Sequence, residues 1–262
     1  MSSRNRYQSS DDEAEASELA ESVVKKEPVV KMKKNKKFNK VFSANTLVIA
    51  KKGISFPLRK FMHEMLRFMP NVQLSKKFTA SQYIQLNTIA EENSCDYIMM
   101  YETVKERDPY LWVSQSPNGP TVCFHLETMH SVDDCHFNGI CTHRSSPILL
   151  FDPEFDKTPE MAICKHLLRK ALQVPFGTRG LKDIVDTALS FFLLDGRIWF
   201  RRYQIEYGEK MNLCESGPRF CLNPAAILSG SFCGRKVWKN PKFVAPHKAR
   251  KTPILSKPQQ SK

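Results

Sequence analysis

Gly217–Gly234 reads GPRFCLNPAAILSGSFCG, and this stretch is the strongest indication of the fold in the sequence. Its opening Gly-Pro step is typical of a turn, because glycine tolerates positive φ and proline fixes its own φ. The aromatic and apolar run that follows predicts a strand. A similar pattern occurs about a hundred residues earlier, where Asn118–Phe124 reads NGPTVCF. A turn and strand that occur twice predict a duplicated unit.

The residues before each of these strands follow the same order of predicted elements. In the first segment, hydrophobic periodicity predicts a strand, two helices, a hairpin and a final strand. These elements are placed at 46–50, 57–69, within 79–92, and at 96–102, 110–114 and 121–126. The first helix has a methionine-rich stripe that predicts core packing, with Arg59, Lys60 and Arg67 on the opposite face.

In the second segment the predicted order is strand, helix, hairpin and strand. Thr158 and Pro159 are typical of a helix N-cap and first helical residue, and Asp195-Gly196 is typical of a two-residue hairpin turn. These elements are placed at 147–151, 159–172, 189–194, 197–203 and after Gly217-Pro218.

The repeated order predicts an α/β fold. Two similar halves, at about 44–130 and 145–234, are expected to pack into one domain that spans 44–240. Residues 1–43 are predicted to form a disordered tail, first acidic and then lysine-rich, and residues 241–262 a basic disordered tail.

The net charge of +13 is unevenly distributed along the chain. Residues 1–42 carry ten Lys/Arg against seven Asp/Glu, residues 43–215 carry twenty against twenty, and residues 216–262 carry ten against none. A neutral body with basic ends is typical of nucleic-acid binding, because contacts between basic side chains and phosphates release counterions. A solubilising tail or a localisation signal gives the same pattern. From Arg235 onward the chain is predicted to be extended or disordered.

Several classes of protein are disfavoured. The chain has no run of some eighteen apolar residues, and its N-terminus lacks the apolar core of a secretory signal. The eight cysteines are therefore expected to be free thiols in an intracellular, soluble protein. Lys51-Lys52-Gly53 lacks the glycine spacing of a nucleotide-binding loop, and no nucleophile elbow is present. No catalytic residue and no cofactor are predicted.

Two clusters could bind a metal ion, and for both the sequence favours another interpretation. Cys135-His136-x4-Cys141-x-His143 contains four zinc-competent side chains, but its spacing matches no common zinc finger and cysteine is frequent throughout the chain. Asp152, Glu154 and Asp156 are more typical of a solvated turn before a helix than of a cation site. No metal site is predicted.

Basic and aromatic side chains alternate on the second strand of the later hairpin. Arg197, Trp199 and Arg201 share one face, while Phe200 and Arg202 share the other. Guanidinium groups on either face could contact RNA phosphates, and exposed rings could stack on unpaired bases. The alternative places the aromatic rings in the core, which is favoured for them, and pairs the arginines with carboxylates.

The predicted RNA-contacting residues lie in three places: on and near this strand, near the start of the first helix, and at the start of the basic tail. A helix N-terminus favours anions such as phosphate. The predicted residues are Lys51, Lys52, Arg59, Lys60, Arg197, Arg201, Arg202, Arg219, Arg235 and Lys236.

Short motifs in this order resemble the Brix domain family. They are LVIA at 47–50, KGIS at 52–55, YLWVS at 110–114, PNGP at 117–120, LFDPEFD at 150–156, DGRIWFR at 195–201, GPRF at 217–220 and GSFCG at 230–234. The resemblance covers about residues 44–240, and the number of motifs makes it specific. The segment at 135–143 and Cys233, where glycine is expected, depart from the family pattern.

The resemblance implies two duplicated α/β halves, each similar to the anticodon-binding domain of some tRNA synthetases. It also implies a non-enzymatic, nucleolar factor that binds pre-ribosomal RNA, ribosomal proteins and other assembly factors while the large ribosomal subunit forms. No membrane and no small-molecule substrate are expected. The alternative is a protein-interaction scaffold in a nuclear ribonucleoprotein, with only incidental RNA contact.

Overall fold

The computed structural model describes residues 45–69, 72–76, 78–79, 82–135, 137, 139, 147–173, 185–208 and 210–250. The strands are β1 (Thr46–Ala50), β2 (Val72–Leu74), β3 (Tyr97–Val104), β4 (Asp108–Gln115), β5 (Thr121–His130), β6 (Ile148–Phe151), β7 (Thr187–Leu194), β8 (Arg197–Glu206), β9 (Asn212–Glu215), β10 (Arg219–Leu228) and β11 (Lys236–Lys239). The helices are α2 (Phe56–Phe68), α3 (Gln85–Glu92), α4 (Pro159–Leu172) and α5 (Pro246–Ala249), with a 3-10 turn η1 (Pro153–Asp156).

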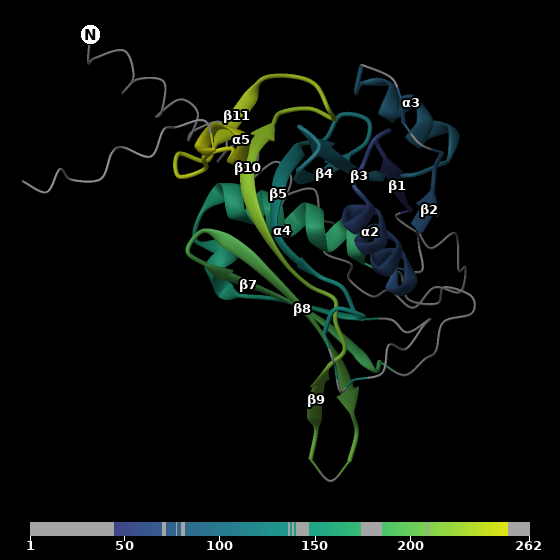
Figure 1. Ribbon diagram of the computed structural model, residues 1–262, viewed down its shortest axis with the longest axis vertical. Helices are drawn as coiled ribbons and strands as arrows, with labels where there is room; N and C mark the ends of the chain where they lie inside the picture. Colours follow the sequence, from purple (N-terminus) through teal and green to yellow (C-terminus); the bar gives the residue numbers. More distant parts are fainter. Residues whose placement is uncertain are drawn as a thin grey trace, which may run out of the picture.

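The eleven described strands form one sheet (Figure 1). Its order is β2-β1-β3-β4-β5-β10-β8-β7-β6, and β11 and β9 pair with β10 and β8 beside this path. Most of Gly217–Gly234 forms β10, which pairs with β5, β8 and β11. The predicted mixed α/β class is therefore confirmed. The segment from which the fold was first predicted, β10, is a central strand of the sheet.

The sheet repeats one pattern in both halves. In the first half β1 runs parallel to β3, and β3, β4 and β5 continue antiparallel. In the second half β6 runs parallel to β7, and β7, β8 and β10 continue antiparallel. The halves join where β5 pairs antiparallel with β10, from Arg219 opposite His130 to Leu228 opposite Thr121. The two Gly-Pro strands of the sequence are thus partners at the centre of the sheet.

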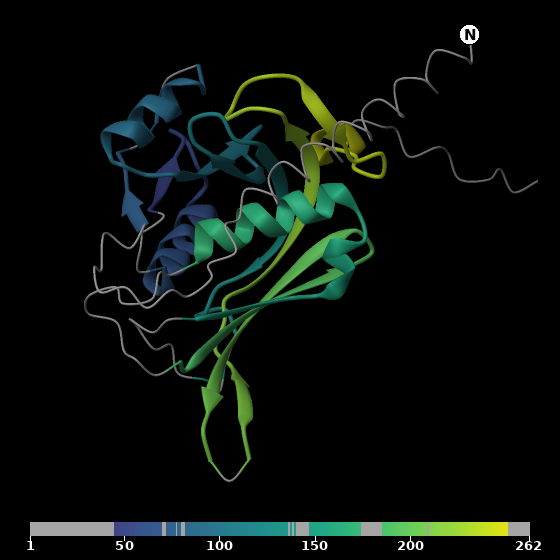
Figure 2. The ribbon, with the colours of Figure 1, turned by 180° about the vertical axis from the view of Figure 1, so that it is seen from behind.

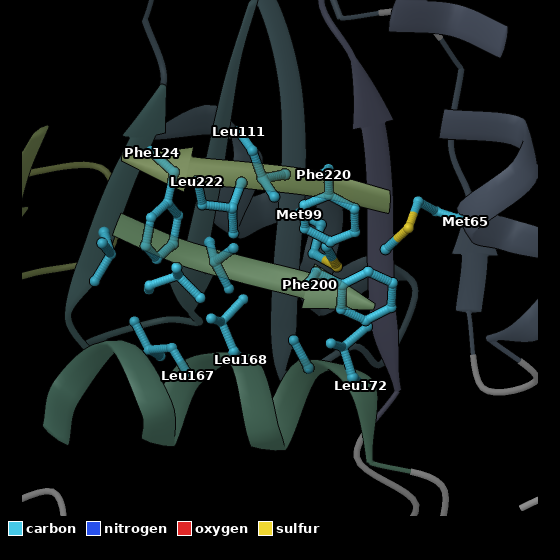
Figure 3. Close-up of a cluster of buried hydrophobic side chains, with 14 of the residues drawn as sticks. Met65, Met99, Leu111, Phe124, Leu167, Leu168, Leu172, Phe200, Phe220 and Leu222 are labelled. Carbon is cyan, nitrogen blue, oxygen red and sulfur yellow. The ribbon is translucent and has the colours of Figure 1, made fainter. Parts of the chain in front are cut away.

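Helices α2 and α4 bury their apolar stripes on one face of this sheet. Figure 3 shows Leu167, Leu168 and Leu172 of α4 pointing toward side chains of β5, β8 and β10, and Met65 of α2 beside them. In Figure 2, α4 lies across the strands. The main core is therefore a sandwich of one sheet face and two helices, one from each half.

The opposite face is covered differently in the two halves. In the first half α3 covers it, and Leu47, Ile49, Ile98 and Met100 below the helix are each 0% exposed. No described helix occupies the corresponding position over β6, β7 and β8.

Two local signals were interpreted correctly from the sequence. Thr158 is the N-cap of α4 with an extended backbone, and Pro159 begins the helix, although the Thr158 side chain makes no capping bond. Asp195 and Gly196 both have positive φ, at 54° and 71°, as a two-residue turn between β7 and β8 requires.

Gly217 is a position where only glycine fits. Its φ is +59°, and an added Cβ would lie 2.3 Å from the Phe137 ring. Both the backbone conformation and the contact therefore exclude a larger residue just before β10.

We expect Gly217→Ala to lower the free energy of unfolding by about 2 kcal/mol, because a strained backbone and an overpacked contact add. Gly196→Ala is the matched control, since Gly196 has φ +71° but nothing within 4 Å of its added Cβ. It should lose only about 1 kcal/mol in urea unfolding. Equal losses in the two variants would show that the Phe137 contact is unimportant.

Residues 1–43 and 251–262, predicted to be tails, lie outside the described residues, and for residues 236–250 the structure corrects the prediction. Far from being an extended tail, this part forms β11, which pairs with β10, and the short helix α5. Within 241–250, a segment predicted to be disordered, Phe243 packs against His125. The short strands β2 and β9 were also not predicted. Among the described residues, no helix is long and apolar enough to span a membrane.

Candidate nucleic-acid interface

The ten predicted RNA-contacting residues do not form one surface. Arg197, Arg201 and Arg219 lie on the outer face of the second half, away from the helices. Arg59 and Lys60 lie on α2, which covers the inner face. Arg235 and Lys236 lie at the start of β11, and Lys51, Lys52 and Arg202 are each in a different environment.

The outer-face arginines are engaged by carboxylates. Arg201 donates to Glu215 over 3.1 and 3.2 Å, and Arg219 donates to the same carboxylate over 2.8 and 3.0 Å. Arg197 pairs with Glu127, with Nε and Oε2 2.6 Å apart. Three arginines therefore face two glutamates. This is the alternative considered from the sequence, in which the arginines pair with carboxylates.

Arg202 does not fit the predicted role. It is 1% exposed, and its guanidinium carbon lies 5.1 Å from the centre of the Phe68 ring on α2. Because neighbouring residues on a strand point to opposite faces, placing Arg201 outside directs Arg202 into the core. Arg202 is therefore a structural residue, and its predicted contact with RNA is wrong. Phe200, which shares this face, is 1% exposed, as the core alternative predicted.

Lys51 is held inside a polar network of the first half. Its Nζ donates to Glu102 Oε1 at 2.6 Å and to the Tyr83 hydroxyl at 2.5 Å, and Glu102 also accepts from Trp112 Nε1. Burial alone would lower the pKa of Lys51, but these hydrogen bonds outweigh it and the pKa is raised. The ammonium group is thus committed to Glu102. Lys52 is exposed and makes no ion pair with any described residue.

A shallow pocket of about 240 Å³ lies beside α2. It is lined by Phe56, Arg59, Lys60, His63, Glu64, Arg67 and Asp133. Lys60 pairs with Asp133 and Asp134 at 3.1 and 3.7 Å, and a hydrogen bond to Asp133 raises its pKa. Three Lys/Arg side chains and two carboxylates line the pocket, and Asp134 beside it is a third carboxylate, so this surface has little net charge.

The chain becomes one-sidedly basic in the segment 235–250, which we call the C-terminal basic segment. It contains Arg235, Lys236, Lys239, Lys242, Lys248 and Arg250, all exposed, and no Asp or Glu. It begins with β11 and ends with α5, at the end of the molecule opposite the β8–β9 hairpin (Figure 1).

This segment folds because a few apolar residues anchor it. Val237 is 1% exposed, and the Phe243 ring lies 5.9 Å from that of His125. Asn240 donates its side-chain amide to Pro224 O at 2.9 Å. The basic side chains are therefore displayed on an ordered scaffold.

The end of the segment is fixed by an ion pair. Arg250 donates two hydrogen bonds to Asp108, at 2.8 and 2.9 Å, and the Asp108 side chain is only 4% exposed. Both bonds come from one nitrogen, Arg250 Nη2, and charge-assisted hydrogen bonds of this kind are stronger than neutral ones. We call this pair the latch.

Three lysines of the segment have no carboxylate partner among the described residues. Lys236, Lys239 and Lys242 are exposed and make no ion pair within the described part of the chain. A fixed group of lysines without counter-charges attracts phosphates more strongly than the paired arginines of the outer face. Sequence reasoning named Lys236 and treated Lys239 and Lys242 only as tail. The apolar Val237-Trp238 pair between lysines was the available sign of a strand.

The described residues show no metal site. Within the parts of the chain that the structure covers, no group of three or more His, Cys, Asp or Glu is placed to hold a metal ion. His136, Cys141 and His143 lie outside the described residues, so the Cys135–His143 cluster stays untested. Asp152 accepts from the backbone N–H of Glu154, and Asp156 pairs with Lys165, as in a solvated turn before α4.

Comparisons with known proteins point in one direction. The model of the Brix domain matches residues 51–226. The chain is 34% identical over 217 residues to the "Ribosome biogenesis protein BRX1" of Saccharomyces cerevisiae, covering 78% of this chain and 75% of that protein. It is 35% identical over 205 residues to the "Ribosome biogenesis protein brx1" of Schizosaccharomyces pombe, covering 76% and 70%.

A solved structure of a probable ribosomal biogenesis protein from Aeropyrum pernix K1 is similar at a TM-score of 0.47 and 13% identity, covering 68% of this chain and 95% of that one. The family match spans more than half of this chain, and the identities to both yeast proteins exceed 30% over most of its length. The chain therefore belongs to the Brix domain family.

Proposed function

We propose that this chain is a non-enzymatic assembly factor that binds ribosomal RNA during formation of the large ribosomal subunit, in the nucleolus. The names of its relatives support a role in ribosome biogenesis. Its partners would be pre-ribosomal RNA, ribosomal proteins and other assembly factors. The RNA contacts are proposed from the charges and positions of this chain's residues, not from its relatives.

The observation that carries the RNA-binding proposal is the ordered C-terminal basic segment. Lys236, Lys239 and Lys242 are exposed, make no ion pair with any described residue and are held on a segment that the latch ties to the domain. Because the lysines are already positioned, RNA binding does not have to order the segment first, and less affinity is lost to entropy. Lys52 and Arg59 would add contacts, whereas the paired arginines would contribute little.

The test is the salt dependence of RNA binding. Removing three phosphate contacts should reduce the slope of log K against log salt by about 2–3 units. We therefore expect the triple variant Lys236→Gln, Lys239→Gln, Lys242→Gln to show this reduction with a fragment of large-subunit ribosomal RNA. Deleting 235–262 would be a poorer test, because it would also remove β11 and the latch.

The control variant removes the same charge elsewhere. Lys76, Lys105 and Lys210 are exposed and make no ion pair with described residues, and they lie outside the segment. The variant with all three replaced by glutamine should show the same slope of log K against log salt as the unmodified protein. Equal slopes in both triple variants would contradict the assignment of RNA contact to this segment and leave only general charge attraction.

The scaffold alternative is favoured by a different observation. Apolar side chains are exposed together on the outer face of the second half, which a purely RNA-binding role does not explain.

A further inference from the structure

The outer face of the second half exposes a contiguous apolar surface, which we call the open face. It consists of Ile148 and Leu150 on β6, Phe192 and Leu194 on β7, and Trp199 on β8, with exposed fractions of 43%, 47%, 39%, 60% and 38%. Phe192 is directly opposite Trp199, and Leu150 is opposite Ser190, two residues from Phe192. Large apolar side chains gathered in this way mark an interaction site.

The corresponding face of the first half shows what covers such a surface. Met100 of β3 is opposite Trp112 of β4, as Phe192 of β7 is opposite Trp199 of β8. Met100 is 0% exposed, and Trp112 stacks on Tyr83 and donates to Glu102. Trp199 makes no hydrogen bond through its side chain to any described residue. The repeat therefore has one covered copy and one uncovered copy of the same surface.

The connection at the corresponding place is half as long in the second half. In the first half, 28 residues, 69 to 96, connect α2 to β3 and contain both β2 and α3. In the second half, 14 residues, 173 to 186, connect α4 to β7. A helix of eight residues, a strand and their connecting loops do not fit into half the length. No described helix covers this face, so the open face has no described equivalent of α3.

The borders of the open face indicate the chemistry of a binding partner. Arg197, Arg201 and Arg219 lie on this face with Glu127 and Glu215, which leaves one positive charge in excess. The covering helix of the first half is itself mildly acidic, since α3 reads QLNTIAEE and has no basic residue. Arginine and tryptophan are also enriched among the strongly contributing residues of protein interfaces.

We propose that the open face binds an amphipathic, acidic helix of a partner protein, which lies across β6, β7 and β8 as α3 lies across β1 and β3. Apolar residues of this helix at i, i+3 or i+4, and i+7 contact Phe192, Trp199 and Leu150. Its carboxylates face the arginines at the border. This inference is independent of the RNA contacts proposed for the C-terminal basic segment.

The test is site-specific photocrosslinking in cells. The full chain carries p-benzoylphenylalanine in place of Phe192, or in place of Phe56, a 76% exposed phenylalanine on α2, as the control. We expect Phe192 crosslinks to map to one segment of one protein, with apolar residues at helical spacing and more Asp and Glu than Lys and Arg. The Phe56 position should not crosslink to that segment.

Three results would overturn the proposal: crosslinks from position 192 to RNA, crosslinks only to other residues of this chain, or no product above the unirradiated sample. A second variant separates this proposal from RNA binding. Leu150→Asp on the open face should reduce the crosslink yield about tenfold, because it places a charge at a position that contacts the helix. RNA affinity of the purified variant should be unchanged, whereas a change would show that the open face contacts RNA.

Discussion

Phe220→Ala is expected to lower the free energy of unfolding by about 3–5 kcal/mol, the range for removing a buried aromatic side chain. Phe220 is 3% exposed and lies near the start of β10. Its ring stacks on Phe200 of β8 at 4.2 Å and meets Phe61 of α2 edge-on at 5.2 Å. The substitution therefore leaves a cavity where both halves and one helix meet.

Urea unfolding followed by circular dichroism measures this effect. Phe56→Ala is the matched control, because the same atoms are removed from a side chain that is 76% exposed. Its loss should stay within about 0.5 kcal/mol. If Phe220→Ala were as mild as the control, β10 would not be the strand on which the core depends.

Arg250→Ala is expected to lower stability by about 3 kcal/mol, because the buried carboxylate of Asp108 loses its partner. We place the value at the low end for a broken buried ion pair, since the Arg250 side chain itself is 47% exposed. The loss should be local, so that α5 and the residues before it detach. Hydrogen exchange should then speed up in 236–250 while the core of the sheet stays protected.

A double-mutant cycle tests the latch. Adding Asp108→Asn to Arg250→Ala removes the unpaired charge and should restore part of the lost stability. If the two substitutions instead add without coupling, the ion pair does not hold the segment. RNA affinity should fall in Arg250→Ala as well, because the lysines would no longer be positioned.

Most of the architecture could be predicted because it depends on local patterns. The buried run of β1, the apolar stripes of α2 and α4 and the Asp195-Gly196 turn are each visible within a few residues. The repeated Gly-Pro motif also indicated the duplication, which the sheet shows as the pairing of β5 with β10. The sequence repeat and the sheet repeat correspond because the same arrangement of strands occurs in both halves.

The missed elements depend on partners that are distant in sequence. β2 and β9 have three and four residues, too few to show a period, and each is defined by the strand beside it. β11 was assigned to a tail because lysines and prolines dominate its surroundings. What orders it is Val237, buried at 1% exposure, and the contact of Phe243 with His125.

The predicted site was least accurate for the arginines. Alternation along β8 correctly separated Arg201 from Arg202, but it could not show which face α2 would cover. Nor could it show that Arg201 and Arg219 share Glu215, because that carboxylate lies on another strand. A list of basic residues therefore overestimates the surface that is available to phosphate.

The most direct test of the central claim is crosslinking of the full chain to RNA in cells, with the crosslinked peptides and nucleotides mapped. We expect crosslinks on peptides of 235–250, at a few sites in large-subunit ribosomal RNA. Crosslinks spread over many RNAs and confined to the N-terminal lysine-rich residues would contradict it. In that case the C-terminal basic segment would not be the RNA-binding element.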